Sequence, residues 1–141
     1  MILAIAALIA DAGCGGSDYS VDSNREAERR LAQLARANRM IVERIREGHA
    51  ERLEETRDAV TIARVVSFPR RYPDRWQQST GIFGDYLLLL YDDQRFIGRL
   101  GLTAGASEGE VTLNVDDYFR GVPLADVVDL ARHLNVPWPP R

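Results

Sequence analysis

The chain has 141 residues, 45% of them hydrophobic, and a formal net charge of −3. That length fits one domain, and the hydrophobic share supports a core and excludes a chain that is disordered throughout. The nearly balanced charge excludes a general nucleic-acid binder, so we expect no nucleic-acid partner. All 18 basic residues are arginine, a bias that a GC-rich genome produces without any functional cause.

The first residues of the chain have the pattern of a targeting segment. Residues 2–10 are apolar without interruption, too short for a bilayer span of about 20 residues but matching the apolar part of a signal peptide. Ala12 and Gly13 precede the single cysteine, Cys14, and a Gly-Gly-Ser-Asp stretch follows it. This arrangement resembles the lipobox region of bacterial lipoproteins, in which lipid is attached to the cysteine, which becomes the new N-terminus after cleavage.

The resemblance implies a signal peptide over residues 1–13, a flexible tether over 14–22 and lipid on Cys14. The protein would then be anchored to a membrane of the cell envelope, facing the periplasm or the exterior, and several acyl chains would make the attachment stable. The alternative is that residues 2–10 form a buried helix or strand and Cys14 is an inert small residue, in a cytoplasmic protein.

Residues 23–66 are predicted to be a helical region. Ser23 can cap a helix, and Glu26 stands three residues later, as in a capping box. Apolar residues then recur at helical spacing and form a candidate interface for a second helix or a homo-oligomer. The candidate helix interface consists of Leu31, Leu34, Ile41 and Ile45. Gly48 either separates two helices or lies within one.

The segment 59–68 has both helical spacing and many β-branched residues. We expect a helix to about Arg64 and an extended stretch before Pro69. The two prolines that follow predict a loop from about residue 68 to residue 81.

Residues 67–141 are predicted to be a small α+β domain. Residues 85–91 and 95–103 are strongly β-forming and are separated by a short polar turn, which predicts a hairpin. The first of these strands is apolar on both faces and should be central. Residues 110–115 alternate as a third strand, and Pro123 begins a last helix. The fold expected is α+β, with an N-terminal helical arm, an antiparallel three-stranded meander and a C-terminal covering helix.

One loop combines arginines with aromatic residues. Arginine stacks on rings and binds anions in a fork, and tyrosine and tryptophan supply large rigid contacts, as in sites for phosphate, carboxylate or protein partners. The candidate binding surface consists of Arg70, Arg71, Tyr72, Arg75 and Trp76. The alternative is that the aromatic rings fill the edge of the core while the arginines are solvated or paired with Asp74.

Other polar residues have simpler interpretations. The aspartate pairs at 92–93 and 116–117 are expected in turns, and His49 and His133 are isolated and expected to be structural. No nucleotide-binding, metal-binding or nucleophile motif occurs in the sequence, so we expect no cofactor, no metal and no catalytic residue.

The leading hypothesis is a lipid-anchored cell-envelope protein that acts as a non-enzymatic interaction module for another envelope protein. A second is a cytoplasmic or phage-type accessory protein that dimerises through its N-terminal amphipathic helix. A third is an enzyme or a binder of a small anion that uses the loop from Arg70 to Trp76. This hypothesis requires a pocket where several arginines meet a carboxylate or His133.

Overall fold

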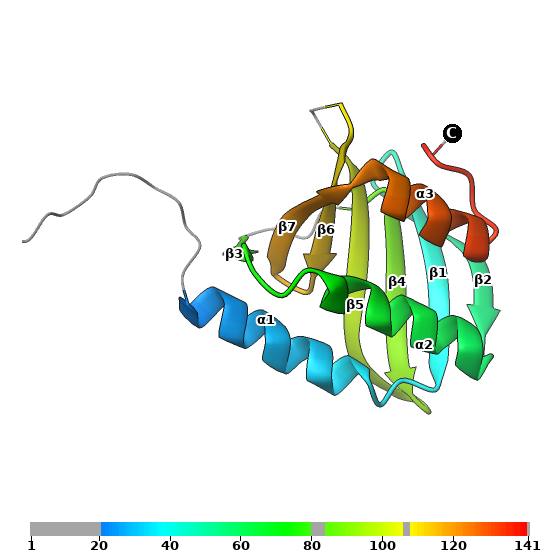
Figure 1. The fold of residues 1–141 in the computed structure, drawn as a ribbon. Helices are drawn as coiled ribbons and strands as arrows, with labels where there is room; N and C mark the ends of the chain where they lie inside the picture. Colours follow the sequence, from blue (N-terminus) through cyan, green and yellow to red (C-terminus); the bar gives the residue numbers. More distant parts are fainter. Residues whose placement is uncertain (1–20, 80–83, 106–107, 141) are drawn as a thin grey trace, which may run out of the picture.

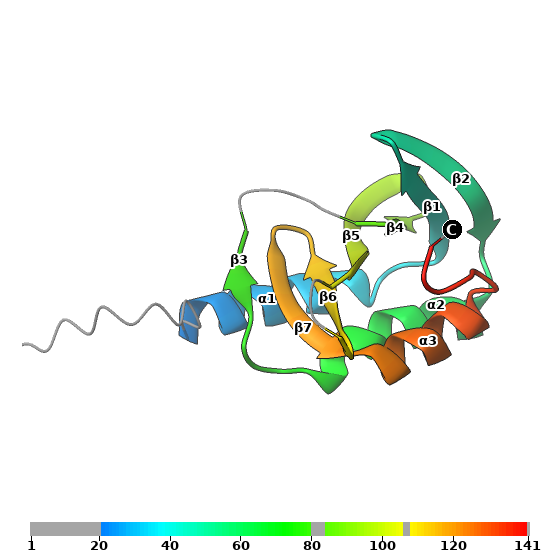
Figure 2. The same cartoon turned by 90° about the horizontal axis from the view of Figure 1, so that it is seen from above.

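The computed structural model describes residues 21–79, 84–105 and 108–140. Within these ranges, an antiparallel sheet of seven strands packs against three helices, which lie on one face of the sheet (Figures 1 and 2). The elements are α1 (Val21–Leu34), β1 (Arg39–Arg46), β2 (His49–Thr56), α2 (Ala59–Ser67), a 3-10 helix η1 (Phe68–Arg71), β3 (Gln77–Gln78), β4 (Tyr86–Asp92), β5 (Arg95–Ala104), β6 (Glu110–Val115), β7 (Tyr118–Pro123) and α3 (Leu124–His133). The strand order is β2-β1-β4-β5-β6-β7-β3. The α+β class is confirmed, but a three-stranded meander covers only β4, β5 and β6.

The expected helix does not extend beyond Leu34, and residues 39–56 form the β1–β2 hairpin instead. The two turn residues, Glu47 and Gly48, have φ angles of 51° and 78°, as a two-residue type I′ hairpin turn requires. The charged residues favour this arrangement too, because Arg44 lies opposite Glu51 and bonds to it at 2.6 Å. The helical prediction over the whole of 23–66 is therefore wrong.

The helix at residues 59–67 is three residues longer than expected. Asp58 caps it by accepting a hydrogen bond from the Thr61 backbone N–H at 2.9 Å. Pro69 then fits the first turn of η1, where it needs no N–H donor. The expected extended stretch before Pro69 is therefore helical, in the last turn of α2 and the first residue of η1. No helix in the described ranges is both long and apolar enough to span a bilayer.

Strand β7 was not expected, because its sequence, YFRGVP, breaks the apolar alternation with a buried arginine. Tyr118, Arg120 and Val122 are buried, and the Arg120 guanidinium donates to the backbone carbonyl of Asp74 at 2.5 Å. A buried arginine with such a partner occupies a position that an apolar residue usually fills. The expected division at residue 67 is also wrong, because strands from both sides of it belong to one sheet.

The core lies between the sheet and the three helices. The predicted faces of β4 are confirmed: Tyr86, Leu88 and Leu90 are in the core with Leu31 and Leu34 of α1, and the alternate residues of β4 are half-buried on the opposite face. The C-terminal segment packs onto this core, since the Tyr86 hydroxyl donates to the Pro137 carbonyl at 2.7 Å.

Candidate interaction surfaces

Cys14 and the predicted signal peptide lie outside the described residues, as does most of the predicted tether. The predictions for these segments are therefore not tested by the structure. The remaining candidate residues all lie within it.

Trp76 belongs to the core and does not form part of a surface. Its side chain is 1% exposed. Its indole N–H donates to the backbone carbonyl of Tyr72 at 2.8 Å, and its backbone N–H donates to the Asn24 side-chain oxygen at 2.9 Å. These bonds join the loop after η1 to α1, so Trp76 fixes the loop in place.

Tyr72 is held by its neighbours in a similar way. Its hydroxyl donates to the carboxylate of Asp126 on α3, its ring packs edge-on against Phe68, and the Arg120 guanidinium lies 4.9 Å from the ring centre. Burial, and secondly the hydrogen bond to Asp126, raise the pKa of the Tyr72 phenol to about 12. This tyrosine connects the loop to α3 and β7.

The arginines of the loop lie on different sides of α2. Arg70 lines a groove between α2 and the segment that joins α1 to β1, called here the α1–α2 groove. Arg71 instead lines a groove between α2 and α3, with its guanidinium 5.5 Å from the Phe68 ring centre. Arg75 has a left-handed φ of 65° just before the buried tryptophan. The five loop residues therefore do not form one binding surface.

The four residues of the candidate helix interface are also separated. Leu31 and Leu34 are on α1 and buried in the core. Ile41 and Ile45 are on β1, where strand alternation turns them away from the core positions Met40 and Val42. A single helical interface is not formed, because the chain leaves the helix at Leu34.

Asp93, Asp116 and Asp117 occupy turns, as expected, whereas Asp92 is the last residue of β4. Asp93 has a left-handed φ of 53°, and its backbone N–H and carboxylate bond to the Asn38 side chain at 2.7 and 2.9 Å. Asp116 and Asp117 form the turn between β6 and β7 and bind α1 through Arg30. Among the described residues, no three His, Cys, Asp or Glu side chains gather in a way that would hold a metal ion.

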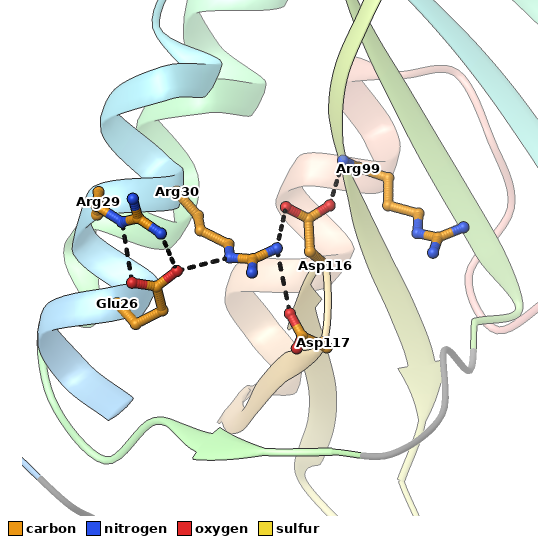
Figure 3. A network of polar contacts seen from close by, with 6 residues as sticks. All are labelled: Glu26, Arg29, Arg30, Arg99, Asp116 and Asp117. Carbon is orange, nitrogen blue, oxygen red and sulfur yellow. Dashed lines mark hydrogen bonds and ion pairs between the residues drawn. The ribbon is translucent and has the colours of Figure 1, made fainter. Parts of the chain in front are cut away.

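Arg30 is the centre of this contact between α1 and the sheet (Figure 3). One Nη lies 3.3 Å from an Asp116 carboxylate oxygen and 3.2 Å from one of Asp117, and its Nε lies 3.3 Å from Glu26. The other Asp116 oxygen accepts a hydrogen bond from the Arg99 backbone N–H at 3.1 Å. The network attaches α1 to β5 and to the β6–β7 turn.

The α1–α2 groove has a volume of about 340 Å³. Its walls are α2 and the chain from the end of α1 to the start of β1. Small apolar side chains dominate the lining, and an arginine stands at each end of α2. The lining residues are Ala35, Ala37, Asn38, Arg57, Ala59, Ile62, Ala63, Val66, Ser67 and Arg70.

The α2–α3 groove consists of two smaller hollows, of about 70 and 130 Å³, which share Arg64, Leu130 and His133. Asp126 and Asp129 also line it. The His133 Nδ1 forms a hydrogen bond with the Asp129 backbone carbonyl at 2.8 Å. Three basic side chains, those of Arg64, Arg71 and His133, therefore share this groove with two carboxylates.

Sequence reasoning did not identify the α1–α2 groove. The local signal was the pair Ala59 and Ala63 at helical spacing with Arg57 and Arg70 on either side. Ala35 and Ala37, however, come from another element, and only the tertiary structure brings them to α2.

This chain matches no protein-family model, no curated protein and no solved structure in the comparisons made.

Proposed function

We propose that this protein is a non-enzymatic protein-interaction module that a lipid on Cys14 attaches to a membrane of the cell envelope. The observation that supports the interaction role is the α1–α2 groove. Concave apolar surfaces with a few polar groups at their margins are typical of binding sites, and Ala59 and Ala63 line this groove on an exposed side of α2.

The anchor rests on the sequence alone. The apolar segment, the two small residues and Cys14 fit the lipoprotein pattern, and the Gly-Gly-Ser stretch after Cys14 gives a tether of flexible composition. The first described element, α1, begins at Val21, seven residues after Cys14, so the lipid and the groove belong to separate parts of the chain.

Photo-crosslinking in cells of the native host tests the interaction role. We expect a photoreactive phenylalanine derivative at Ala63 to form a covalent adduct with another protein. The same residue at Gln94, in the exposed β4–β5 turn, is the matched control and should form none. The absence of an adduct at Ala63, or equal adducts at both positions, would contradict the proposal.

The α2–α3 groove supports a second candidate function, the binding of a small anion. The observation in its favour is that Arg64, Arg71 and His133 line one groove. Titration of the full chain with inorganic phosphate, followed by NMR, should then shift resonances of these residues. Unchanged spectra, or the same shifts after Arg64→Gln and Arg71→Gln together, would reject this function.

A further inference from the structure

The polar groups in the lining of the α1–α2 groove are mostly satisfied within the protein. Both the oxygen and the nitrogen of the Asn38 amide bond to Asp93, and the Ser67 hydroxyl donates to the Arg64 carbonyl at 3.0 Å. The other lining residues between the two arginines are alanine, isoleucine and valine. A ligand of this groove therefore needs an apolar surface that can pack against small side chains.

The groove has no strand edge in its walls. Strand-forming peptides bind by adding to the edge of a sheet, whereas helices bind by placing an apolar face in a groove. Its walls are α2 and the segment around Ala35 and Ala37. Four alanines in the lining let another helix approach to about 8 Å, the lower end of the usual interaxial distance. The geometry favours a helical occupant.

Arg57 and Arg70 give the groove its charge. Both are exposed, and neither has a hydrogen bond or ion pair with another residue in the described part of the chain. Arg57 does act at longer range on the exposed Glu55, as the last and smallest of the causes that lower the pKa of that carboxyl. Many other arginines do have such a partner, including Arg29, Arg30, Arg39 and Arg44. Two unpaired cations at the ends of an apolar groove are complementary to carboxylates on a partner.

The spacing of the two arginines limits where those carboxylates lie. The two arginines are 13 residues apart in the sequence, with the nine residues of α2 between them. The α2 helix alone is about 13 Å long at 1.5 Å per residue. The matching acidic residues therefore stand at least about nine positions apart on a partner helix. Two arginines are too few for the array of phosphates on a nucleic acid.

From these observations we infer that the α1–α2 groove binds an amphipathic helix of a partner protein, with acidic side chains at least about nine positions apart that contact Arg57 and Arg70. This inference rests on the proposed function and adds the class of partner to it. The occupant is a protein helix rather than a lipid surface, because the apolar lining is recessed between two walls and consists of small side chains.

Selection of binding peptides tests the inference. The full chain is used to select from a phage-displayed library of random 18-residue peptides, and the peptides obtained are synthesised and their affinities measured by fluorescence anisotropy. We expect helical peptides with an apolar face and two acidic residues nine to thirteen positions apart, about three turns of helix.

Charge reversal in the protein gives the decisive comparison. Arg57→Glu with Arg70→Glu should weaken binding of these peptides about tenfold or more, and added salt should weaken binding to the original protein. Arg25→Glu with Arg29→Glu makes the same change of charge at two exposed arginines of α1 outside the groove and should leave the affinity unchanged.

A second pair of variants tests the apolar lining. Ala63→Trp fills the groove and should abolish binding, whereas Ala32→Trp, at an exposed alanine of α1 outside the groove, should not. Thermal unfolding of each variant establishes that it is folded.

Three results would overturn the inference. They are failure to select any peptide, selected peptides without the acidic spacing, and equal affinity for the groove variants and their controls. Vesicles of phosphatidylglycerol and phosphatidylethanolamine provide a further arm, since binding of vesicles but not of peptides would assign the two arginines to a lipid surface. If Ala63 forms protein adducts in cells while the peptide results fail, the proposed function stands and this inference is wrong.

Discussion

At the residue scale, Tyr72 shows how the arginine-rich loop is held. Its phenol is partly buried and donates to Asp126, and its pKa is raised to about 12 from an ordinary value of 10.0. Since the folded state holds the phenol proton more tightly than the unfolded state does, this contribution to stability is present below pH 10. It is lost as the pH rises from 10 towards 12.

We predict that Asp126→Asn lowers the pKa of Tyr72, because the substitution removes a carboxylate beside the phenol. The pKa should stay above 10, since burial is the larger of the two causes. Tyrosinate absorbance at 295 nm measures the titration, and Tyr72→Phe identifies which part of the signal belongs to this residue. An unchanged Tyr72 titration in Asp126→Asn would show that the hydrogen bond does not control it.

Gly98 on β5 is required where the strand passes α1. Its φ is 155°, and a Cβ atom there would lie 2.6 Å from a methyl carbon of Leu34. We predict that Gly98→Ala lowers the free energy of unfolding by about 1–3 kcal/mol, the usual cost of overpacking, as measured by urea denaturation.

Gly48 provides the control for this substitution. It also has a positive φ, of 78°, but no atom lies within 4 Å of the position of its Cβ. Gly48→Asn should therefore change stability by less than about 1 kcal/mol, because asparagine tolerates the left-handed conformation. Equal effects at both glycines would show that the contact with Leu34 is not the cause.

At the element scale, the position of α1 depends on Arg30 as well as on its buried leucines. We predict that Arg30→Ala destabilises the protein by about 1–2 kcal/mol, because it leaves Asp116 and Asp117 partly buried without their cation. It should also raise the hydrogen-exchange rates of α1 amides more than those of β4.

Arg29→Ala is the matched control for Arg30→Ala. Arg29 pairs with Glu26 on the same helix, and its side chain is 65% exposed. Exposed pairs of this kind contribute little to stability, so α1 should exchange as it does in the original protein. Equal hydrogen-exchange protection of the α1 amides in both variants would show that Arg30 does not hold α1 against the sheet.

The elements that the sequence predicted correctly are those whose pattern is local and apolar. Strands β4, β5 and β6 and helix α3 were found because their buried residues follow the period of a strand or a helix. The β1–β2 hairpin was missed because arginine and glutamate favour helices and Ile41 and Ile45 have helical spacing. The chain forms a hairpin there, and its two turn residues, Glu47 and Gly48, have the left-handed conformation that a two-residue hairpin turn requires.

The candidate sites were less predictable than the strands. Trp76 and Tyr72 bond to Asn24 and Asp126, each about fifty residues away in sequence, so no local pattern shows that their side chains are occupied. The same applies to the α1–α2 groove, whose alanines come from two separate segments. Sequence patterns identified side chains able to bind a partner, but tertiary contacts determine which of them are available.

For the molecule as a whole, we propose a domain with an apolar groove and a lipid that holds this domain at a membrane. The groove lies between α2 and the segment that joins α1 to β1, and the predicted lipid site, Cys14, lies seven residues before the first residue of α1. In this proposal, the domain presents the groove to another envelope protein while the lipid remains in the membrane.

We predict that Cys14→Ser moves the protein from the membrane fraction to the soluble fraction of the native host, because no lipid is then attached. The control is Ser17→Ala, which leaves the cysteine in place and should remain with the membrane. Equal fractionation of the two variants would contradict a lipid anchor.

We propose that this domain acts from a lipid anchor, and the mass of the N-terminal peptide gives the sharpest test of that proposal. The measurement is mass spectrometry of the protein purified from membranes of the native host. We predict a mature N-terminus at Cys14 that carries acyl chains, with residues 1–13 removed. A protein that retains Met1 and an unmodified Cys14 would contradict it.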